Sequence, residues 1–408
     1  MFEMDINDPA SDNTLRKSIL LRNADIVLPD QVLSAASFLV RDGRIVSVGP
    51  SSEQPEICAH EPLNLDGLRI YPGFIDVHIH GAVGVDTMSA SKDDLDRVSR
   101  FLAAHGVTAW LPTLVPAPAR DYARAISAIE ALMQQQANEE VQSGARVLGV
   151  HYEGPFVSTS QCGALRSAYF KSFSSASDLE SLPTPNPAGA VRMMTVAPEI
   201  EGGVELISQL VARGWIVAIG HTRAGIEILD QAFAAGARHM THFMNAMPPL
   251  HHRAPGPVGW GLAHDEVTCD LIADGIHLDR LVLKILLRTR GADRLTMISD
   301  AIAAAGQGDG DYQIWGETIA VRNGRTSNAQ GSIAGSVITM LAAARMMQSV
   351  GASDVEVARM TSTNPARLLG IDRDRGSIET GKRADLVALD QTGAVQLTII
   401  AGEVVLQS

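Results

Sequence analysis

The sequence predicts an α/β protein, a (β/α)8 TIM-like barrel with a small β-sandwich domain built from both chain termini. Three observations support this prediction. From residue 74 onward, eight short apolar runs alternate with amphipathic stretches, and strand-like segments lie at both ends of the chain. The 408 residues exceed the roughly 250 of a bare barrel. An open, doubly wound sheet is the alternative, and polar residues at the ends of several strands favour closure.

The two predicted domains are interleaved along the chain. Turns at Asp42-Gly43 and Ala401-Gly402 interrupt β-rich segments near each end, as in hairpins. We interpret these segments as one domain, although two separate edge ribbons are an alternative. The small domain is predicted at 15–70 plus 376–408, with strands at 18–28, 37–48, 385–389 and 395–406, and the barrel at 71–375.

The barrel elements follow from the periodicity of apolar residues. Ser91, with Asp94 three residues later, predicts a capped helix start. The predicted strands are 74–80, 107–113, 146–153, 191–197, 216–221, 238–242, 267–274 and 294–300. The predicted helices are 91–104, 118–136, 203–213, 225–235, 279–290, 336–349 and 354–369.

Composition narrows the classes of partner. The formal net charge is −13 without a basic cluster, which argues against nucleic acid. The polar N-terminal segment resembles no signal peptide, and no run of about 18 apolar residues predicts a membrane span. Three scattered cysteines fit a reducing cytoplasm, and we interpret Cys162 as a bystander. We therefore expect a cytoplasmic protein.

Two histidines close the first barrel strand. His78 and His80 end the segment YPGFIDVHIHG. Side chains at i and i+2 of a strand face the same way, so both imidazoles are expected at the C-terminal end, where a barrel has its active-site mouth. A metal is the simplest reason to pair them there, and two partly exposed histidines without a ligand are the alternative.

Later strand ends supply further ligands. Glu153 ends the third predicted strand, His221 the fifth, His242 the sixth and Asp300 the eighth. His239 lies three residues before His242 and faces another side, so we interpret it as a packing or surface histidine. A salt bridge is the alternative for Glu153.

The combined set predicts a divalent metal site with one or two ions. Glu153 would bridge two ions, and Asp300, also counted among the ligands, would act as general base and then general acid. Zn, Fe, Mn and Co all suit mixed histidine and carboxylate ligands.

Two loops carry candidate substrate contacts. Arg253 is a fork-shaped donor suited to phosphate or carboxylate, and backbone N–H groups at Asn245 and Ala246 suit an anion. His277 follows the seventh strand at the rim. An ordinary surface arginine and a loop histidine are equally weighted alternatives.

These residues resemble the N-acetylglucosamine-6-phosphate deacetylase family of the amidohydrolase superfamily. THFMNAMPP, the following HHRAPG and ADGIH are the specific part, whereas the closing GSIETGKRADLVALD is common to the superfamily. The other matching motifs are PGFIDVHIHG, GVHYEGPF, AIGHT, ISDA, GSIAGS and NPARLLG.

The resemblance implies a distorted TIM barrel that removes the acetyl group from N-acetylglucosamine 6-phosphate, giving glucosamine 6-phosphate and acetate. It implies metal ligands Glu153, His221 and His242 and a catalytic Asp300. Many family members carry one metal and lack the first histidine pair, so His78 and His80 resemble two-metal members. It also implies substrate contacts from Asn245, Ala246, Arg253, His277, Gly335 and Ser336, in a homodimer whose Arg253 reaches the neighbouring site.

Two positions depart from the family pattern. In the loop QCGALRS, Leu165 stands where single-metal members usually have a histidine that polarises the substrate carbonyl, and leucine donates no hydrogen bond. Either a second metal ion polarises the carbonyl in place of the histidine, or the substrate differs. The adjacent Arg166 is a candidate to compensate for the missing donor. Arg223 stands where a short polar residue is more usual.

Other functions stay open at this stage. One alternative is deacetylation of another N-acetylated amino sugar, either galactosamine 6-phosphate or an unphosphorylated sugar. A second is an amidohydrolase acting on a cyclic amide or another N-acyl substrate; Glu153 in place of a bridging lysine argues against the cyclic-amide type. A third is a barrel without activity that serves as a scaffold, which the complete ligand set disfavours.

Overall fold

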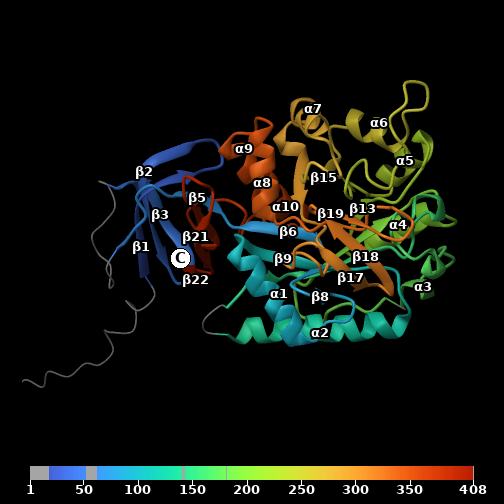
Figure 1. Ribbon diagram of the computed structural model, residues 1–408, viewed down its shortest axis with the longest axis horizontal. Coiled ribbons are helices and arrows are strands. Elements are labelled where there is room, and N and C mark those ends of the chain that lie inside the picture. Colours follow the sequence, from blue (N-terminus) through green and yellow to red (C-terminus); the bar gives the residue numbers. More distant parts are fainter. Residues whose placement is uncertain (1–17, 52–61, 140–142, 181, 408) are drawn as a thin grey trace, which may run out of the picture.

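The computed structural model describes residues 18–51, 62–139, 143–180 and 182–407, which form a barrel and a smaller β domain beside it (Figure 1). Residues 15–17, 52–61 (which include Cys58) and 408 of the predicted small domain lie outside the described residues.

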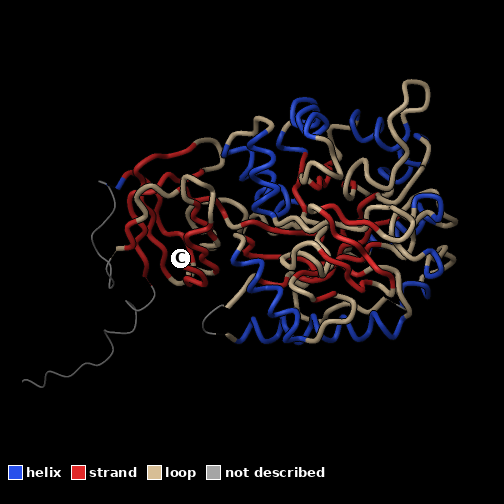
Figure 2. The backbone as a smooth tube through the Cα atoms, viewed as in Figure 1, coloured by secondary structure: helices blue, strands red, loops and turns tan. Residues whose placement is uncertain are grey.

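Eight parallel strands form the barrel wall, each at a predicted position, and Figure 2 shows them enclosed by helices. Their order is β6-β9-β11-β12-β13-β14-β15-β16, and the short β10 also pairs with β9. The strands are β6 (Phe74–Ile79), β9 (Val107–Leu114), β10 (Arg146–Val147), β11 (Gly149–Glu153), β12 (Val191–Val196), β13 (Ile216–Ile219), β14 (His239–Met240), β15 (Thr268–Ile272) and β16 (Leu295–Ile298).

The first and last strands meet where the chain leaves β16. The Asp300 N–H donates to the His78 carbonyl at 2.9 Å, and the His80 N–H donates to the Ala301 carbonyl at 2.8 Å. The buried Asp76 carboxylate accepts the Ser299 hydroxyl across the same junction at 2.5 Å. These bonds nearly close the barrel, and they fix the segment that carries Asp300 beside the segment that carries the histidine pair.

Helices cover the outside of the barrel. The Ser91–Asp94 capping box is present at the start of α1, as predicted. The helices are α1 (Lys92–Ala104), α2 (Ala119–Asn138), α3 (Ser177–Glu180), α4 (Gly203–Ala212), α5 (Ile226–Ala234), α6 (Gly256–Ala263), α7 (Arg280–Arg290), α8 (Met340–Ser349), α9 (Asp354–Ala358) and α10 (Asn364–Leu368).

Three helical segments differ from expectation. The helix predicted at 336–349 begins only at α8, because the Thr339 side chain caps it there. The helix predicted at 354–369 is divided into α9 and α10 by a π-helical turn, just before Pro365, which has no N–H to donate. The proline- and glycine-rich segment after Arg253, where no helix was predicted, forms α6, because proline is tolerated in the first turn of a helix.

The two chain ends form one mixed sheet, so the alternative of separate ribbons is wrong. Strand β5 pairs parallel with β1 and antiparallel with β20, which joins the two halves. The order is β22-β21-β20-β5-β1-β2-β3, with β4 paired to β1. The strands are β1 (Ser18–Val27), β2 (Val32–Arg41), β3 (Arg44–Pro50), β4 (Leu63–Asn64), β5 (Arg69–Pro72), β20 (Leu386–Leu389), β21 (Val395–Ile400) and β22 (Glu403–Gln407).

The two predicted hairpin turns meet inside this sheet. Gly43 and Gly402 both have positive φ, +75° and +80°. A Cβ on Gly43 would lie 2.6 Å from the Ala401 carbonyl oxygen, so only glycine allows the turns to approach this closely. The sheet buries its own apolar core, which includes Leu21, Phe38, Leu386 and Ile399.

Two small antiparallel sheets were not predicted. One is β7 (Gly81–Ala82) with β8 (Val85–Asp86), directly after the first barrel strand. The other follows Asp300 and consists of β17 (Gly310–Ile314), β18 (Glu317–Arg322) and β19 (Arg325–Ser327). The second sheet packs beside the mouth of the barrel.

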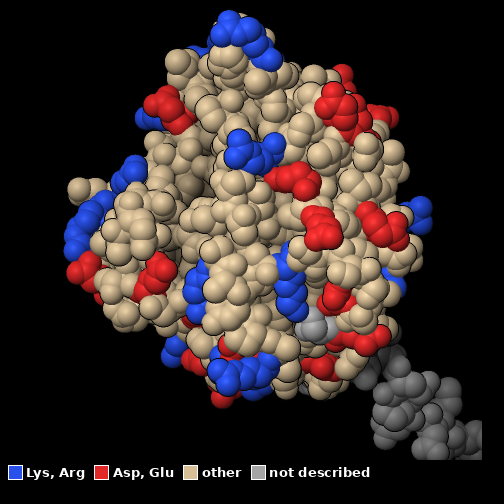
Figure 3. Space-filling model, turned by 90° about the vertical axis from the view of Figure 1, so that its right-hand side faces the viewer, with Lys and Arg blue, Asp and Glu red and all other residues tan. Residues whose placement is uncertain are grey.

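On the face in Figure 3, basic and acidic side chains of the described residues are interspersed, and neither kind gathers into a broad patch. Within the described part of the chain, no helix has the length and apolar character needed to cross a membrane.

Candidate metal and substrate site

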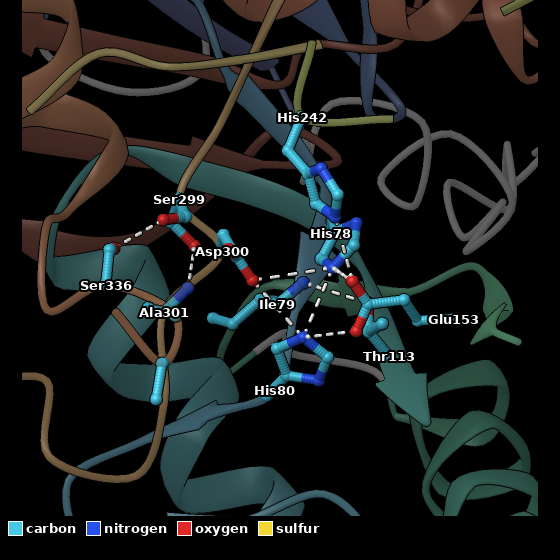
Figure 4. A network of polar contacts seen from close by, with 12 residues as sticks. His78, Ile79, His80, Thr113, Glu153, His242, Ser299, Asp300, Ala301 and Ser336 are labelled. Atoms are coloured by element: carbon cyan, nitrogen blue, oxygen red, sulfur yellow. Dashed lines mark hydrogen bonds and ion pairs between the residues drawn. The ribbon is translucent and has the colours of Figure 1, made fainter. Parts of the chain in front are cut away.

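Six predicted side chains converge at the C-terminal ends of five barrel strands. Figure 4 shows five of them: His78, His80, Glu153, His242 and Asp300. All six residues are buried. His78 lies on β6 and His80 just beyond it, and Glu153 is the last residue of β11. The other three follow β13, β14 and β16 by two residues each: His221, His242 and Asp300.

The last three turn inward through an uncommon backbone conformation. The φ angles of His221, His242 and Asp300 are +47°, +30° and +48°. A left-handed backbone costs a non-glycine residue about 1–2 kcal/mol, and such strain is found mainly at functional sites. The fold thus holds these three side chains in the mouth of the barrel, and the strained backbone lowers the free energy of unfolding.

Glu153 lies between two groups of histidines. Its Oε1 is 2.9 Å from His221 Nε2 and 3.0 Å from His242 Nε2. Its Oε2 is 3.3 Å from His80 Nε2, and Oε1 is 3.6 Å from His78 Nε2. The carboxylate therefore belongs to two buried His/Glu clusters, one with His78 and His80 and one with His221 and His242.

Asp300 faces the first cluster. Its Oδ1 lies 3.4 Å from His78 Nε2 and 3.2 Å from His80 Nε2, which are themselves 3.2 Å apart. The Ser336 N–H donates to the Asp300 carbonyl at 2.7 Å, and a Cβ on Gly335 would lie 3.0 Å from that oxygen. The Gly335-Ser336 segment thus packs directly against the backbone of Asp300.

The donor set fits divalent cations. The His221 Nδ1 donates to the Gln161 carbonyl at 2.8 Å, so in the neutral ring Nε2 carries a lone pair. That lone pair faces a carboxylate oxygen and, at 3.1 Å, His242 Nε2. Converging acceptors repel unless a positive charge lies among them. Imidazoles and a carboxylate form such a ligand set, and the two clusters are consistent with a binuclear metal site.

Electrostatics at the site follow from burial and these neighbours. Burial alone would raise the pKa of the Glu153 carboxyl, but His78, His221 and His242 hold it well below its usual range. Burial lowers the pKa of His78 well below its usual value. Burial also acts to lower the pKa of His80, but Asp300 and Glu153 outweigh it and raise that pKa to about 10. A cation binding at His80 therefore displaces a proton.

A buried polar layer beneath the site was not predicted from the sequence. The ring of His151, on β11, donates from Nδ1 to the Val77 carbonyl at 2.9 Å, and its Nε2 is 2.9 Å from Thr195 Oγ1. Thr241 continues the chain of hydroxyls at 2.7 Å. His151 lies two residues before Glu153, and this spacing was the available signal that both face the barrel interior.

A cavity of about 300 Å³ opens onto the ligands. Four of the residues predicted to contact substrate line it: Asn245, Ala246, His277 and Gly335. The Asp274 carboxylate accepts the His277 Nδ1–H at 2.6 Å and so orients the imidazole. Leu165 also lines the cavity. The cavity wall is therefore apolar at the position where the family pattern usually has a histidine. Trp315 is a lining residue that sequence analysis missed.

Other predicted residues lie away from this cavity. Arg253 is exposed, and its guanidinium contacts His252 at 2.8 Å. The Ser336 hydroxyl donates to the Ser299 carbonyl behind Asp300. Arg166 lies over the Tyr169 ring, 4.8 Å from its centroid. His239 is buried, with Nε2 2.8 Å from an Asp270 oxygen, which agrees with its interpretation as a packing histidine.

Comparisons with known proteins agree over nearly the whole chain. The model of the amidohydrolase family matches residues 69–405. The chain is 36% identical over 394 residues to the N-acetylglucosamine-6-phosphate deacetylase of Bacillus subtilis (strain 168), covering 96% of this chain and 98% of that protein. It is 35% identical over 380 residues to the N-acetylgalactosamine-6-phosphate deacetylase of Escherichia coli O157:H7, covering 91% and 98%.

A solved structure shows the same fold. It is an aspartate-to-alanine variant of the N-acetyl-D-glucosamine-6-phosphate deacetylase of Mycobacterium smegmatis, in complex with N-acetyl-D-glucosamine-6-phosphate. The TM-score is 0.86 at 32% identity, and the match covers 96% of this chain and all of the other.

Proposed function

Because this chain belongs to the N-acetylglucosamine-6-phosphate deacetylases of the amidohydrolase family, we propose that it hydrolyses N-acetylglucosamine 6-phosphate to glucosamine 6-phosphate and acetate. The observation that carries the proposal is the convergence of the two His/Glu clusters and Asp300 on one cavity that also presents Asn245, Ala246 and His277.

We propose a site for two divalent cations, both of which Glu153 would help to hold. His221 and His242 would hold one ion, and His78 and His80 would hold the other, with Asp300 as a further ligand. Zn, Fe, Mn and Co all suit these ligands. When bound, such ions supply the positive charge that polarises an amide carbonyl and acidifies water.

Asp300 is the proposed proton carrier. Its carboxylate accepts the proton of the attacking water as the water oxygen bonds to the acetyl carbon. The same group then delivers that proton to the sugar nitrogen as the carbon–nitrogen bond breaks, releasing acetate and the amine. The backbone bonds from Asp300 to His78 and Ser336 keep the carboxylate aimed at the first cluster throughout.

The sugar phosphate would lie on the side of the cavity formed by the loop after β14. The Asn245 N–H already donates to the His242 carbonyl at 2.9 Å, so the prediction that it binds an anion is wrong. The proposed contacts are the Ala246 N–H, the His277 ring held by Asp274 and the Asn245 side chain, with Gly335 beside the sugar. Arg253 is exposed and does not line this cavity, and we propose that it reaches the site of a second subunit in a homodimer. We also propose a cytoplasmic location, in keeping with the scattered cysteines.

The deciding experiment compares kcat/KM for N-acetylglucosamine 6-phosphate, N-acetylgalactosamine 6-phosphate and unphosphorylated N-acetylglucosamine on metal-loaded protein. We expect a strong preference for the phosphorylated glucosamine derivative. The galactosamine derivative is the second candidate, because the E. coli relative named for it is almost as similar. Absence of acetate release from all three would overturn the proposal.

A further inference from the structure

The tip of an unpredicted hairpin carries a tryptophan into the cavity. Trp315 and Gly316 form the two-residue turn between β17 and β18, with φ of +55° and +81°. Asn-Gly, Asp-Gly and Gly-Gly are the usual residues of such turns, because both positions require positive φ. A tryptophan there is strained by about 1–2 kcal/mol, and strain of this kind accompanies functional positions.

The indole stands against a candidate metal ligand. Its ring lies edge-on to His80, with centroids 5.2 Å apart and planes at 82°. The Nε2 of that histidine is 3.2 Å from Asp300 Oδ1. The His80 ring therefore lies between Trp315 and Asp300, the group proposed to transfer the proton.

The hairpin is fixed relative to Asp300. Ile314, Ile319 and Val321 pack with Ile302 in one apolar cluster, against which Trp315 and Ala164 also pack. The Thr326 hydroxyl donates to the Gly335 carbonyl at 2.6 Å, which ties β19 to the segment behind Asp300. The Trp315 indole N–H is buried. Burial raises the pKa of the Asp86 carboxyl, and the interaction of that group with the indole N–H acts to lower it. The side chain is thus a rigid wall.

The cavity has a polar and an apolar side. Asn245 and His277 belong to the segments after β14 and β15, whereas Trp315 and Leu165 belong to the hairpin and to the loop after β11. In an amide, the acyl chain is bonded directly to the carbon that reacts, so it must lie within a few ångströms of Asp300. An apolar chain there requires an apolar wall.

We infer that Trp315, together with Leu165, closes the acyl end of the cavity and restricts the substrate to short N-acyl groups. This inference rests on the proposed function. It assigns a role in substrate specificity to Trp315, a residue outside the strand-end motifs. The indole acts by filling the space into which a second or third acyl carbon would extend.

Trp315→Gly is the informative variant, because glycine adopts positive φ without strain and keeps the turn. Trp315→Phe retains an aromatic ring, and Gln313→Ala, on the exposed side of the same hairpin, is the matched control. The substrates are N-acetyl, N-propionyl and N-butyryl glucosamine 6-phosphate, and kcat/KM is measured by release of the free amine. Calorimetric binding of the N-butyryl compound to Asp300→Asn, with and without Trp315→Gly, separates binding from turnover.

For the unmodified protein and Gln313→Ala we expect kcat/KM to fall about tenfold or more with each added methylene. Trp315→Gly should lose most of that discrimination and bind the N-butyryl compound more tightly, with Trp315→Phe in between. An unchanged ratio among acyl groups in Trp315→Gly would overturn the inference, as would an equal rise in KM for all three, which would place the indole against the sugar. Failure of the unmodified protein on every substrate would instead overturn the proposed function.

Discussion

The carboxylate of Asp76 and the hydroxyl of Ser299 form a buried hydrogen bond of 2.5 Å across the junction of the first and last barrel strands. Asp76 Oδ1 also accepts the backbone N–H groups of His78 and Ser299, each at 3.3 Å. Asp76 lies two residues before His78, and Ser299 lies immediately before Asp300. This contact therefore sets the distance between the histidine pair and the proposed proton carrier.

Asp76→Ala should lower the free energy of unfolding by about 3 kcal/mol, because it leaves buried donors unsatisfied at about 1–3 kcal/mol each. Ser299→Ala should cost less, about 1 kcal/mol, since Asp76 keeps its backbone donors. Thermal unfolding of metal-loaded protein, with the double variant, measures the coupling between the two residues. Additive single effects would contradict a direct role of this bond.

The number of bound metal ions should depend on which of the two His/Glu clusters is intact. We expect two ions per chain by elemental analysis after dialysis, and loss of activity on chelation. His80→Asn should retain one ion and His242→Asn should retain the other, while Glu153→Ala should bind neither tightly. Asparagine suits position 242 because it tolerates positive φ. The binuclear site would be refuted if the parent bound only one ion per chain and His80→Asn still retained that ion.

Asp300→Asn should lower kcat by about 10²–10⁴-fold, the usual contribution of a positioned acid–base group. Asparagine keeps the shape of the side chain and tolerates the φ of +48° at this position. Metal content measured on the same sample shows whether the site still fills. A variant with full metal and a kcat within tenfold of the parent would remove Asp300 from the chemistry.

The Asp274–His277 pair should make stability depend on pH. Burial acts to raise the pKa of the Asp274 carboxyl, but His277 and two backbone N–H groups lower it overall. A lowered pKa in the folded state stabilises above the unfolded value, about 4, and this stabilisation is lost as pH falls through the folded value. Asp274→Asn should therefore destabilise by about 1–3 kcal/mol at pH 7 and progressively less in acid.

Thermal unfolding from pH 7 to pH 3 measures this difference, with the exposed Asp93→Asn as control. The same variant should raise KM for the sugar phosphate, because the imidazole loses its orientation. A difference between parent and Asp274→Asn that does not shrink on acidification would contradict the assignment.

Mixed dimers test whether Arg253 serves the neighbouring subunit. Arg253→Ala and Asp300→Asn should each be nearly inactive alone. In a mixed dimer, the site with an intact Asp300 receives Arg253 from the other chain, so random mixing should restore about a quarter of the parent activity. No recovery in a mixture shown to exchange subunits would place Arg253 outside the active site.

Much of the barrel could be predicted because its chemistry is local. The strand ends that carry His78, Glu153 and Asp300 are apolar runs followed by a polar residue, and period-two geometry placed the histidine pair on one side. The same reasoning separated His242, in the mouth, from His239, which packs against Asp270.

Contacts between distant segments could not be predicted in this way. Asp76 and Ser299 are 223 residues apart, and nothing local to either residue identifies its partner. Trp315 was missed because Trp-Gly is an unusual sequence for its turn, so the hairpin carries no recognisable turn signal. The strand-end position of His221 was predicted, whereas the left-handed backbone that turns its side chain inward was not.

The central position of β5 in the terminal sheet has a consequence for how the chain is made. Its neighbours are β1, which precedes it, and β20, which is synthesised only after the entire barrel. While the ribosome is still adding barrel residues, β5 is an open edge, and open edges pair with strands of other chains. The nascent chain must therefore shield this edge until β20 emerges, and slow translation between the two strands would favour aggregation.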